Sequence, residues 1–302
     1  MKKVMNYDTY GWVRLRLLAA LSRSAKLWND ETYLKMLYRL RLGRKLNLDH
    51  PQRLTEKLQW LKLYDRQPRY TAMADKYAAK QMVEQTIGGG ITIPLIGVYD
   101  HFDDIPFDTL PDRCVLKTTH DSGGMVVYER GKTDMAAARR KLERSLSHDY
   151  WIYAREWPYK DIPKRILIEE YVPTLGHPDS VEYKLTCMNG VCKMVTVCTG
   201  IPHAKNSMRF NDHYDRDWNP IPFWVDYRNT GRTFEKTAII EEAIRLSEKL
   251  AQGVPYLRVD WYNDNGRLLF GELTFFTHAG LMWFMPDEYD FKLGSWLELP
   301  SR

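Results

Sequence analysis

The sequence predicts a mixed α+β fold preceded by a helical segment. Three patterns support this fold class. Apolar residues recur at helical spacing through residues 1–70, helical and strand patterns alternate from Ala74 onward, and an Asn189-Gly190 turn joins two strand-like runs. At 302 residues, the chain is long enough for about two structural units with sizeable cores. Its 44% hydrophobic and 27% charged residues are typical of a globular protein and exclude long disorder.

Three helices are expected in the first 70 residues. The second helix spans 30–42, with Asn29 or Asp30 as its N-cap and Gly43 as its stop, and the third spans 53–64. The first helix carries an apolar stripe at i, i+4, i+7 and i+8, and we expect this stripe to pack on the rest of the protein. The stripe consists of Val13, Leu17, Ala20 and Leu21.

The rest of the chain alternates between strands and helices. A polar stretch at 200–223 is expected to be a long loop, and loops of this length are usually functional or mobile. Further helices are expected at 74–87, 134–147 and 233–251. Strands are expected at 93–100, 113–119, 125–130, 165–172, 181–188, 191–198, 256–262 and 267–276.

The sequence predicts a cytoplasmic protein. No apolar run approaches the roughly 18–20 residues that a membrane span needs, and the opening residues lack the apolar core of a signal peptide. The four cysteines contain no Cys-x-x-Cys pair, so we expect free buried thiols rather than a zinc site.

Positive charge is concentrated at the start of the chain. Residues 1–50 carry eleven Lys or Arg and four Asp or Glu, a net charge of +7, whereas the whole chain has +5 and the remainder therefore −2. This distribution argues against a nucleic-acid channel through the body, and no nucleic-acid partner is expected. The basic helices, 8–45, are interpreted as a surface helix pair packed on the body, a patch for peripheral contact with anionic membrane lipid at the inner face of the membrane, or a partner-binding arm.

The last predicted hairpin places carboxylates inside strands. Asp260 lies mid-strand among apolar residues, and Glu272 lies on the partner strand with Thr274 on the same face. Carboxylates rarely occupy strand interiors unless they are paired or bind a cation. The pair predicts a Mg²⁺ site shared with substrate phosphates, or else ion pairs with Arg258, Arg267 or another arginine.

Two further groups of residues could contact a nucleotide. Lys117 lies on the strand 113–119, which leads into a glycine-containing turn at 120–124. Backbone N–H groups of such a turn can surround phosphate oxygens, although an ordinary hairpin turn has the same pattern. The Walker A order is absent. The strand end at Glu169-Glu170 could contact an adenine or a ribose or simply leave the core, and Lys184 could point into a cleft or lie on a solvated face.

In their order along the chain, these groups resemble the ATP-grasp superfamily, and within it the branch associated with teichuronopeptide and other cell-surface polysaccharide biosynthesis. The resemblance covers about residues 50–285. It rests on the stretches LTEKLQWLKLYDRQP (54–68), ADKYAAKQMV (74–83), CVLKTTHDSGG (114–124), ILIEEYV (166–172), EYKLTCMNG (182–190) and RVDWYNDNGRLLFGELTFF (258–276).

The resemblance implies an ATP-grasp fold, in which two α+β subdomains clamp ATP. It implies an N-terminal subdomain over 71–112, a lid subdomain over 113–172, and a C-terminal subdomain with the metal site over 173–302. The residues 1–70 are expected to form a basic helical extension of this fold, and its first helices lie outside the resemblance.

The resemblance also implies a role for each matching residue. Asp260, Glu272 and Thr274 would hold Mg²⁺ ions, and Arg258 would stabilise an acyl-phosphate or tetrahedral intermediate. Arg209 is a candidate contact for the γ-phosphate or for the donor carboxylate. The ATP-binding residues would be Lys76, Lys117, His120, Ser122, Gly123, Gly124, Glu169, Glu170, Val172, Glu182 and Lys184.

Two departures from the superfamily pattern concern the acceptor side. Thr274 stands where many ATP-grasp enzymes have Asn, and the segment 275–280 lacks the common Pro. A hydroxyl group can still bind Mg²⁺ or a water ligand, so Thr274 stays a candidate ligand.

The function implied is ATP- and Mg²⁺-dependent ligation of a carboxylate to an amine through an acyl-phosphate, attaching an amino acid or amino sugar in cell-surface polysaccharide biosynthesis. The partners would be a carboxylate-bearing glycan or nucleotide-sugar acceptor and an amine donor. The alternatives are a sugar kinase on the same fold, and a glycosyltransferase or carbohydrate-binding protein that uses its 10 Trp and 19 Tyr for stacking. The oligomeric state is left open.

Overall fold

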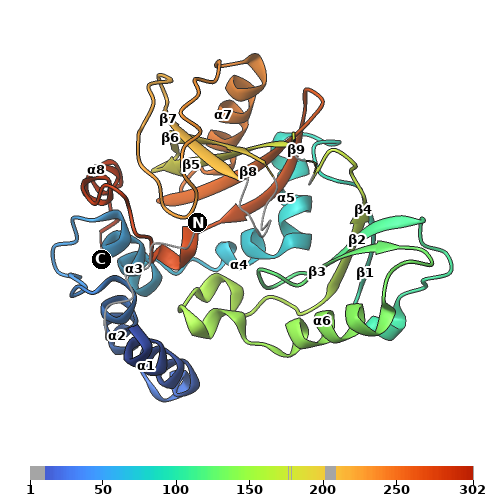
Figure 1. Ribbon diagram of the computed structural model, residues 1–302, viewed down its shortest axis with the longest axis horizontal. Coiled ribbons are helices and arrows are strands. Elements are labelled where there is room, and N and C mark those ends of the chain that lie inside the picture. Colours follow the sequence, from blue (N-terminus) through green and yellow to red (C-terminus); the bar gives the residue numbers. More distant parts are fainter. Residues whose placement is uncertain (1–10, 176, 178, 201–208, 302) are drawn as a thin grey trace.

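The computed structural model describes residues 11–175, 177, 179–200 and 209–301, and it contains two antiparallel β-sheets with helices packed on them (Figure 1). The strands are β1 (Leu95–Tyr99), β2 (Arg113–Thr118), β3 (Met125–Glu129), β4 (Ile166–Glu170), β5 (Val181–Met188), β6 (Val191–Thr199), β7 (Phe210–Asp215), β8 (Tyr256–Asp264) and β9 (Arg267–Thr274). The α-helices are α1 (Gly11–Arg23), α2 (Asp30–Leu42), α3 (Leu54–Tyr64), α4 (Arg69–Ala74), α5 (Lys76–Ile87), α6 (Met135–Ser147), α7 (Ala238–Leu250) and α8 (Glu288–Trp296). Five short 3₁₀ helices complete the described elements: η1 (Ala25–Leu27), η2 (Phe102–Asp104), η3 (Tyr150–Tyr153), η4 (Trp157–Tyr159) and η5 (Thr277–Gly280).

The smaller sheet has the strand order β1-β4-β2-β3, and α6 packs against it. Leu142 of α6 is fully buried in one core with Leu116 of β2 and Ile168 of β4. The sheet takes β1 from the segment 71–112 and its other three strands from the segment 113–172. The four subdomain boundaries themselves stay predictions.

The larger sheet has the order β7-β6-β5-β8-β9, and α7 covers one of its faces. Alternate residues of a strand point to opposite faces, and on the helix-covered face Val259 and Trp261 are completely buried. The Trp261 indole N–H donates to Ser247 Oγ of α7 at 2.8 Å. The opposite face carries polar side chains, and it is the face that matters for the site.

The helices at the start form where the sequence predicts them, but the packing of the first helix differs. Asn29 caps α2 by accepting from the Thr32 N–H at 2.9 Å, and Gly43 ends the helix with φ of 70°. In α1 the predicted stripe is confirmed at Leu21, which is buried, but it is wrong at Leu17 and Ala20, which are exposed. Leu18, outside the stripe, packs with Leu21 on the core shared with α2 and η3.

All eight predicted strands form, but the short helix α4 was not predicted, and two further elements were missed as well. β7 lies inside the predicted loop at 200–223 and pairs antiparallel with β6, and residues 201–208 of that loop lie outside the described residues. Its sequence FNDHYD is polar, yet His213 and Tyr214 are buried, so hydrophobic alternation could not reveal it. The other missed element is α8, which packs on α3.

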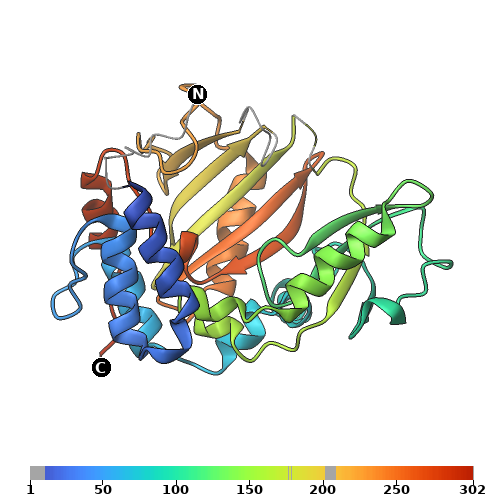
Figure 2. The same cartoon turned by 60° about the horizontal axis from the view of Figure 1, so that its bottom comes forward.

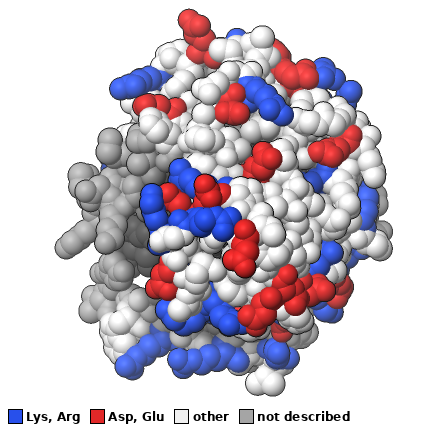
Figure 3. All heavy atoms as spheres, turned by 90° about the vertical axis from the view of Figure 1, so that its right-hand side faces the viewer, with Lys and Arg blue, Asp and Glu red and all other residues white. Residues whose placement is uncertain are grey.

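Within the described ranges, no helix is both long enough and apolar enough to cross a bilayer. Figure 3 shows the side of the molecule that carries the smaller sheet, where basic and acidic side chains are interspersed.

A buried histidine on β7 makes stability depend on pH. His213 stacks on Phe223 with ring centroids 4.0 Å apart, and its Nδ1 lies 2.9 Å from Thr196 Oγ1. Burial lowers the pKa of His213 to about 3. Below pH 6.5 the imidazole therefore binds a proton in the unfolded chain but stays neutral in the native state, and this lowers the unfolding free energy. Between pH 7 and pH 5, we expect the unfolding free energy of the unmutated chain to fall by about 2 kcal/mol more than that of His213→Gln. Urea unfolding at the two pH values would measure this difference. Parallel losses in the two proteins would contradict this assignment.

Candidate active site

The polar face of the larger sheet aligns three charged side chains across three strands. Lys184 of β5 is opposite Asp260 of β8, which is opposite Glu272 of β9. The register between β8 and β9 shifts directly after this pair, so Gly271 is an extra residue in a β-bulge. Bulges re-aim neighbouring side chains and are common beside active sites. The hairpin therefore brings the two carboxylates to one face, as the sequence predicts.

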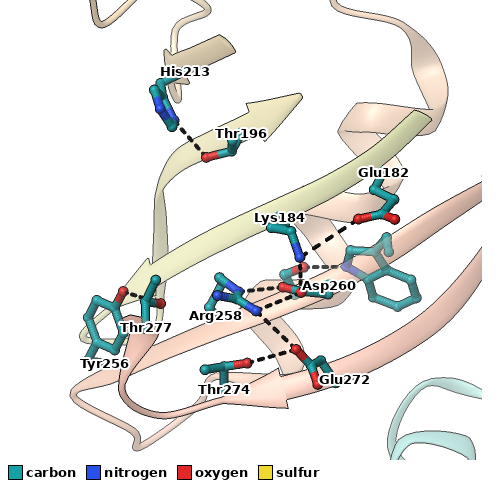
Figure 4. A network of polar contacts seen from close by, with 12 residues as sticks. Glu182, Lys184, Thr196, His213, Tyr256, Arg258, Asp260, Glu272, Thr274 and Thr277 are labelled. Atoms are coloured by element: carbon teal, nitrogen blue, oxygen red, sulfur yellow. Dashed lines mark hydrogen bonds and ion pairs between the residues drawn. The ribbon is translucent and has the colours of Figure 1, made fainter. Parts of the chain in front are cut away.

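Cations already surround these carboxylates (Figure 4). Lys184 Nζ lies 2.5 Å from Asp260 Oδ2. Arg258 Nε lies 2.6 Å from Asp260 Oδ1, and Arg258 Nη2 lies 3.0 Å from Glu272 Oε1. Burial alone would raise the pKa of Asp260, but Arg258 and Lys184 outweigh it and the net pKa is lowered. Asp260 is therefore an ionised carboxylate at neutral pH, and the ion pair with Arg258 expected as the alternative to metal binding is present.

The same residues fit a Mg²⁺ ion that shares its ligands with a substrate. Asp260 and Glu272 provide hard oxygen atoms, and Thr274 Oγ1 donates to Glu272 Oε1 at 3.4 Å. Among the residues that the structure describes, no cluster of three or more His, Cys, Asp and Glu side chains could hold a metal. Mg²⁺ typically uses one or two carboxylates and takes its other ligands from phosphates and water, so this donor set suits it.

Glu182 and Arg209 form a pair beside this cluster. Arg209 Nη2 lies 2.6 Å from Glu182 Oε2, and Lys184 Nζ lies 3.8 Å from the same oxygen. Arg209 directly precedes β7, and it is buried, with 7% of its surface exposed. Its suggested contact with a phosphate or carboxylate stays a prediction, and such a contact would have to compete with Glu182.

The smaller sheet contributes a second charged cluster, centred on Glu169. This carboxylate is 3% exposed and lies between Lys117 Nζ at 2.5 Å and Lys80 Nζ at 2.6 Å. The two lysines outweigh the effect of burial and lower the pKa of Glu169. In this structure Glu169 positions Lys117 rather than presenting a free carboxylate to a nucleotide. Lys80 was not predicted, although it lies one helical turn after Lys76 on α5 and therefore on the same face.

Lys76 connects the two clusters. Burial lowers its pKa, and nearby Glu272 and Asp121 oppose this shift, so Lys76 lies within electrostatic reach of the carboxylate on β9. Its Nζ donates to the backbone carbonyl of Asp121. Burial raises the pKa of Tyr262 on β8, and the nearby carboxylates of Glu182 and Glu272 raise it further. No sequence pattern pointed to Tyr262.

The turn after β2 is anchored by the Asp121 carboxylate, which accepts from the hydroxyls of Thr118 and Ser145. Ser122 and Gly123 are exposed at its tip, where they could approach phosphates. The His120 side chain points inward, 1% exposed, and burial lowers its pKa.

Gly124 is buried against this anchor, and a Cβ atom there would overlap Thr118 Oγ1 and Ser145 Oγ. We expect Gly124→Ala to lower the unfolding free energy by about 1–3 kcal/mol and to weaken ATP binding, because the turn must shift. Thermal unfolding with and without nucleotide would measure both effects. Gly89→Ala is the matched control, since nothing lies within 4 Å of its Cβ position. Equal effects of the two variants would contradict the packing argument.

The remaining predicted nucleotide contacts lie at the end of β4. The Glu170 side chain is exposed while its backbone N–H donates to Pro94 O at 3.0 Å, and Val172 is half-buried. Their contact with adenine or ribose stays a prediction.

The segment after β9 has an unusual backbone. His278, Ala279 and Gly280 have φ values of 49°, 55° and 65°, and such conformations are rare for residues other than glycine. Two side chains of α3 donate hydrogen bonds to the backbone carbonyls of this turn. Lys62 Nζ donates to Ala279 O at 2.7 Å, and Gln59 Nε2 donates to Gly280 O at 2.9 Å. Backbone strain of this kind clusters at functional sites, and His278 faces Asp226, with Nδ1 3.1 Å from Oδ2.

Several solved structures resemble parts of this chain, whereas no curated protein matches it. They include D-alanine–D-alanine ligase from Bacillus anthracis in complex with ATP, with 16% identity and a TM-score of 0.39, and the alignment covers 72% of this chain and 56% of that one. The Helicobacter pylori D-alanine–D-alanine ligase has 13% identity and a TM-score of 0.43, with 81% and 69% covered. N5-carboxyaminoimidazole ribonucleotide synthetase from Thermus thermophilus has 14% identity and a TM-score of 0.39, with 68% and 45% covered.

The chain thus spans little more than half the length of the B. anthracis ligase. The family comparison is more extensive, since the TupA-like ATP-grasp family matches residues 56–298, which include both sheets and both charged clusters. The chain therefore belongs to the TupA-like ATP-grasp family.

Proposed function

We propose that the protein is an ATP- and Mg²⁺-dependent ligase that joins a carboxylate to an amine. One observation carries the proposal: Lys184, Asp260 and Glu272 are aligned on a sheet face within electrostatic reach of Lys76, a lysine from a different part of the chain. Such a site offers cations for a triphosphate and carboxylates for the ion that accompanies it.

The lysines would bind ATP. Lys76 and Lys117 would contact its phosphates. Glu169 would hold Lys117 in place, and Lys80 in turn is ion-paired with Glu169. The turn from His120 to Gly124 would close over the triphosphate, and the end of β4 would contact the adenine and the ribose.

The carboxylates would hold Mg²⁺. When bound, it supplies positive charge to the phosphate oxygens. Asp260 and Glu272 would orient it, and Thr274 would add a hydroxyl. Arg258 and Lys184, which now neutralise these carboxylates, would then be freed in part to contact phosphate or carboxylate oxygens.

This arrangement suits activation of a carboxylate. A carboxylate is a poor electrophile, and its negative charge is repelled by the triphosphate. The cations of the two charged clusters would reduce this repulsion, so the carboxylate oxygen can attack the γ-phosphorus with ADP as the leaving group. The amine then attacks the acyl carbon of the acyl-phosphate, loses a proton and expels inorganic phosphate.

We further propose that the substrates belong to cell-surface polysaccharide biosynthesis. The acceptor would be a carboxylate-bearing glycan or nucleotide sugar, and the donor an amino acid or amino sugar. The supporting observation is the match to the TupA-like family over 56–298.

Product analysis tests the proposal. The purified chain with ATP, Mg²⁺, a uronic-acid acceptor and an amine donor should release ADP and phosphate only when both substrates are present. ADP and a phosphorylated sugar without free phosphate would instead identify a kinase. MgATP at 100 times its Kd should add about 2.7 kcal/mol of stability, and no stabilisation at any concentration would overturn nucleotide binding itself.

A further inference from the structure

The segment from α1 to the residue after η1 exposes an unusual amount of apolar surface. Within the described residues, fifteen large hydrophobic side chains are exposed, and five of them lie in the seventeen positions from 12 to 28. Leu27 is 84% exposed and Trp12 is 60% exposed. These five are Trp12, Leu15, Leu17, Leu27 and Trp28. A segment that exposes this many large apolar side chains is a candidate interaction site.

The orientation of α1 is fixed, so this surface faces outward. Arg14 Nε donates to Leu40 O of α2 at 2.6 Å, and Leu21 is buried in the core that α1 and α2 share with η3. On a helix with 3.6 residues per turn, Trp12, Leu15 and Arg23 lie on the side opposite Leu21. Figure 1 shows α1 at the lower edge of the molecule, and in Figure 2, where this edge comes forward, α1 lies toward the viewer.

The charge of the same segment is entirely positive. Residues 11–29 contain four Lys or Arg and no Asp or Glu. Arg14 is turned toward α2, whereas the other three cations, Arg16, Arg23 and Lys26, are exposed. The Arg16 guanidinium lies 5.2 Å from the centroid of the Trp12 ring, so cation and aromatic side chain share one face. We call Trp12, Leu15, Leu27 and Trp28, together with these three cations, the N-terminal docking face, because Leu17 projects from α1 about 140° away from Trp12.

We propose that the N-terminal docking face binds the surface of an anionic lipid bilayer. A helix of 13 residues is about 20 Å long, too short for the roughly 30 Å hydrocarbon core, but long enough to lie in the interface plane. Tryptophan and leucine side chains would enter the headgroup region, and the three cations would contact lipid phosphates. Lys26 Nζ lies 3.6 Å from Asp149 Oδ2, but the segment 11–29 itself carries no carboxylate. Its positive charge attracts an anionic surface and disfavours a second copy of this equally basic face.

This inference does not rest on the proposed function, because none of its residues belongs to either charged cluster. If it holds, chemistry at the site takes place beside a membrane, where a lipid-anchored substrate is available. Its failure would leave the ligase proposal untouched.

Vesicle co-sedimentation of the full chain tests the proposal. We expect binding to vesicles of phosphatidylcholine with phosphatidylglycerol, weakening as salt rises, and little binding to pure phosphatidylcholine. Trp12→Ala/Leu15→Ala should lower the vesicle affinity about tenfold or more. Arg16→Gln/Arg23→Gln should lower it about 30-fold and flatten the salt dependence.

Controls separate lipid binding from a folding defect and from self-association. Val191→Ala/Lys249→Gln removes one exposed apolar side chain and one exposed cation elsewhere, and it should bind vesicles like the unmutated chain. All variants should keep the thermal shift with MgADP, which reports an intact nucleotide site. Equal binding to both vesicle types, or unchanged binding by both docking-face variants, would overturn the proposal. So would a lipid-free dimer that Trp12→Ala/Leu15→Ala abolishes, since the face would then be a contact between two copies.

Discussion

Asp260→Asn is expected to lower kcat/KM for the ATP-dependent reaction by about 10²–10³-fold, because it removes a charged oxygen ligand without changing side-chain shape. Asp260 is 5% exposed and lies between Lys184 and Arg258. The substitution should also raise the Mg²⁺ concentration needed for half-maximal activity. Glu272→Gln should have the same kinetic effect with a smaller loss of stability, since the Glu272 side chain is 46% exposed. Steady-state kinetics over a Mg²⁺ titration would measure these effects.

Asp264→Asn provides the matched control, because Asp264 lies at the end of the same strand and accepts a hydrogen bond from Thr174 Oγ1 that asparagine can retain. It should react like the unmutated chain. If Asp260→Asn kept full Mg²⁺-dependent turnover and lost only thermal stability, the carboxylate would serve the ion pairs alone and the metal assignment would be wrong.

Lys62→Met is expected to lower the unfolding free energy by about 3–5 kcal/mol. The Lys62 amine is fully buried and donates to Gln59 Oε1 at 3.1 Å, Ala154 O at 2.8 Å and Ala279 O at 2.7 Å. Burial lowers the pKa of Lys62 to about 8 and raises that of Glu156 to about 7, while each charge favours the other. Methionine would leave the three acceptors unpaired and would remove the positive charge that favours ionisation of the buried Glu156 carboxylate. Urea unfolding would measure the loss.

A double-mutant cycle distinguishes the charge effect from the hydrogen bonds. Lys62→Met/Glu156→Gln should lose less stability than the sum of the two single variants, because no buried charge remains. Lys57→Met is the matched control on the same helix, where the half-buried amine donates only to Leu297 O at 2.6 Å among the bonds described. A loss for Lys62→Met as small as that for Lys57→Met would show that Lys62 does not hold the turn after β9.

Much of the site could be predicted because its signal is local. A carboxylate in a strand interior is unusual, so Asp260 and Glu272 stood out, and a hairpin fixes which residues lie opposite one another. The same holds for Lys184, whose alternation with apolar neighbours on β5 put it on the polar face. The Asn29 cap likewise depends only on adjacent residues. The same is true of the Asn189-Gly190 turn, in which Asn189 has φ of 51° and Gly190 has φ of 80°.

The residues that escaped prediction owe their roles to distant parts of the chain. In the sequence, Lys80 has the pattern of an ordinary exposed helix cation. Only the fold shows that β4 places Glu169 beside it. Lys62 carries no signal at all, since only the folded chain shows which carbonyls surround its amine. The packing of α1 failed for a similar reason, because its inward face depends on where α2 and η3 lie.

The hydrogen bonds between α3 and the turn after β9 also affect the order in which the chain folds. The bonds from Lys62 and Gln59 to Ala279 and Gly280 join residues more than 210 positions apart, and Thr55 binds Asp290 of α8 across 235 positions. Contacts of such long range form late, because loop closure must come first. During synthesis on the ribosome, α3 would be complete long before residues 277–280 emerge, so the turn after β9 could gain its bonds from Lys62 and Gln59 only after the strands of both sheets have been made. A nascent chain stalled before Asp290 should then bind nucleotide before it can turn substrate over.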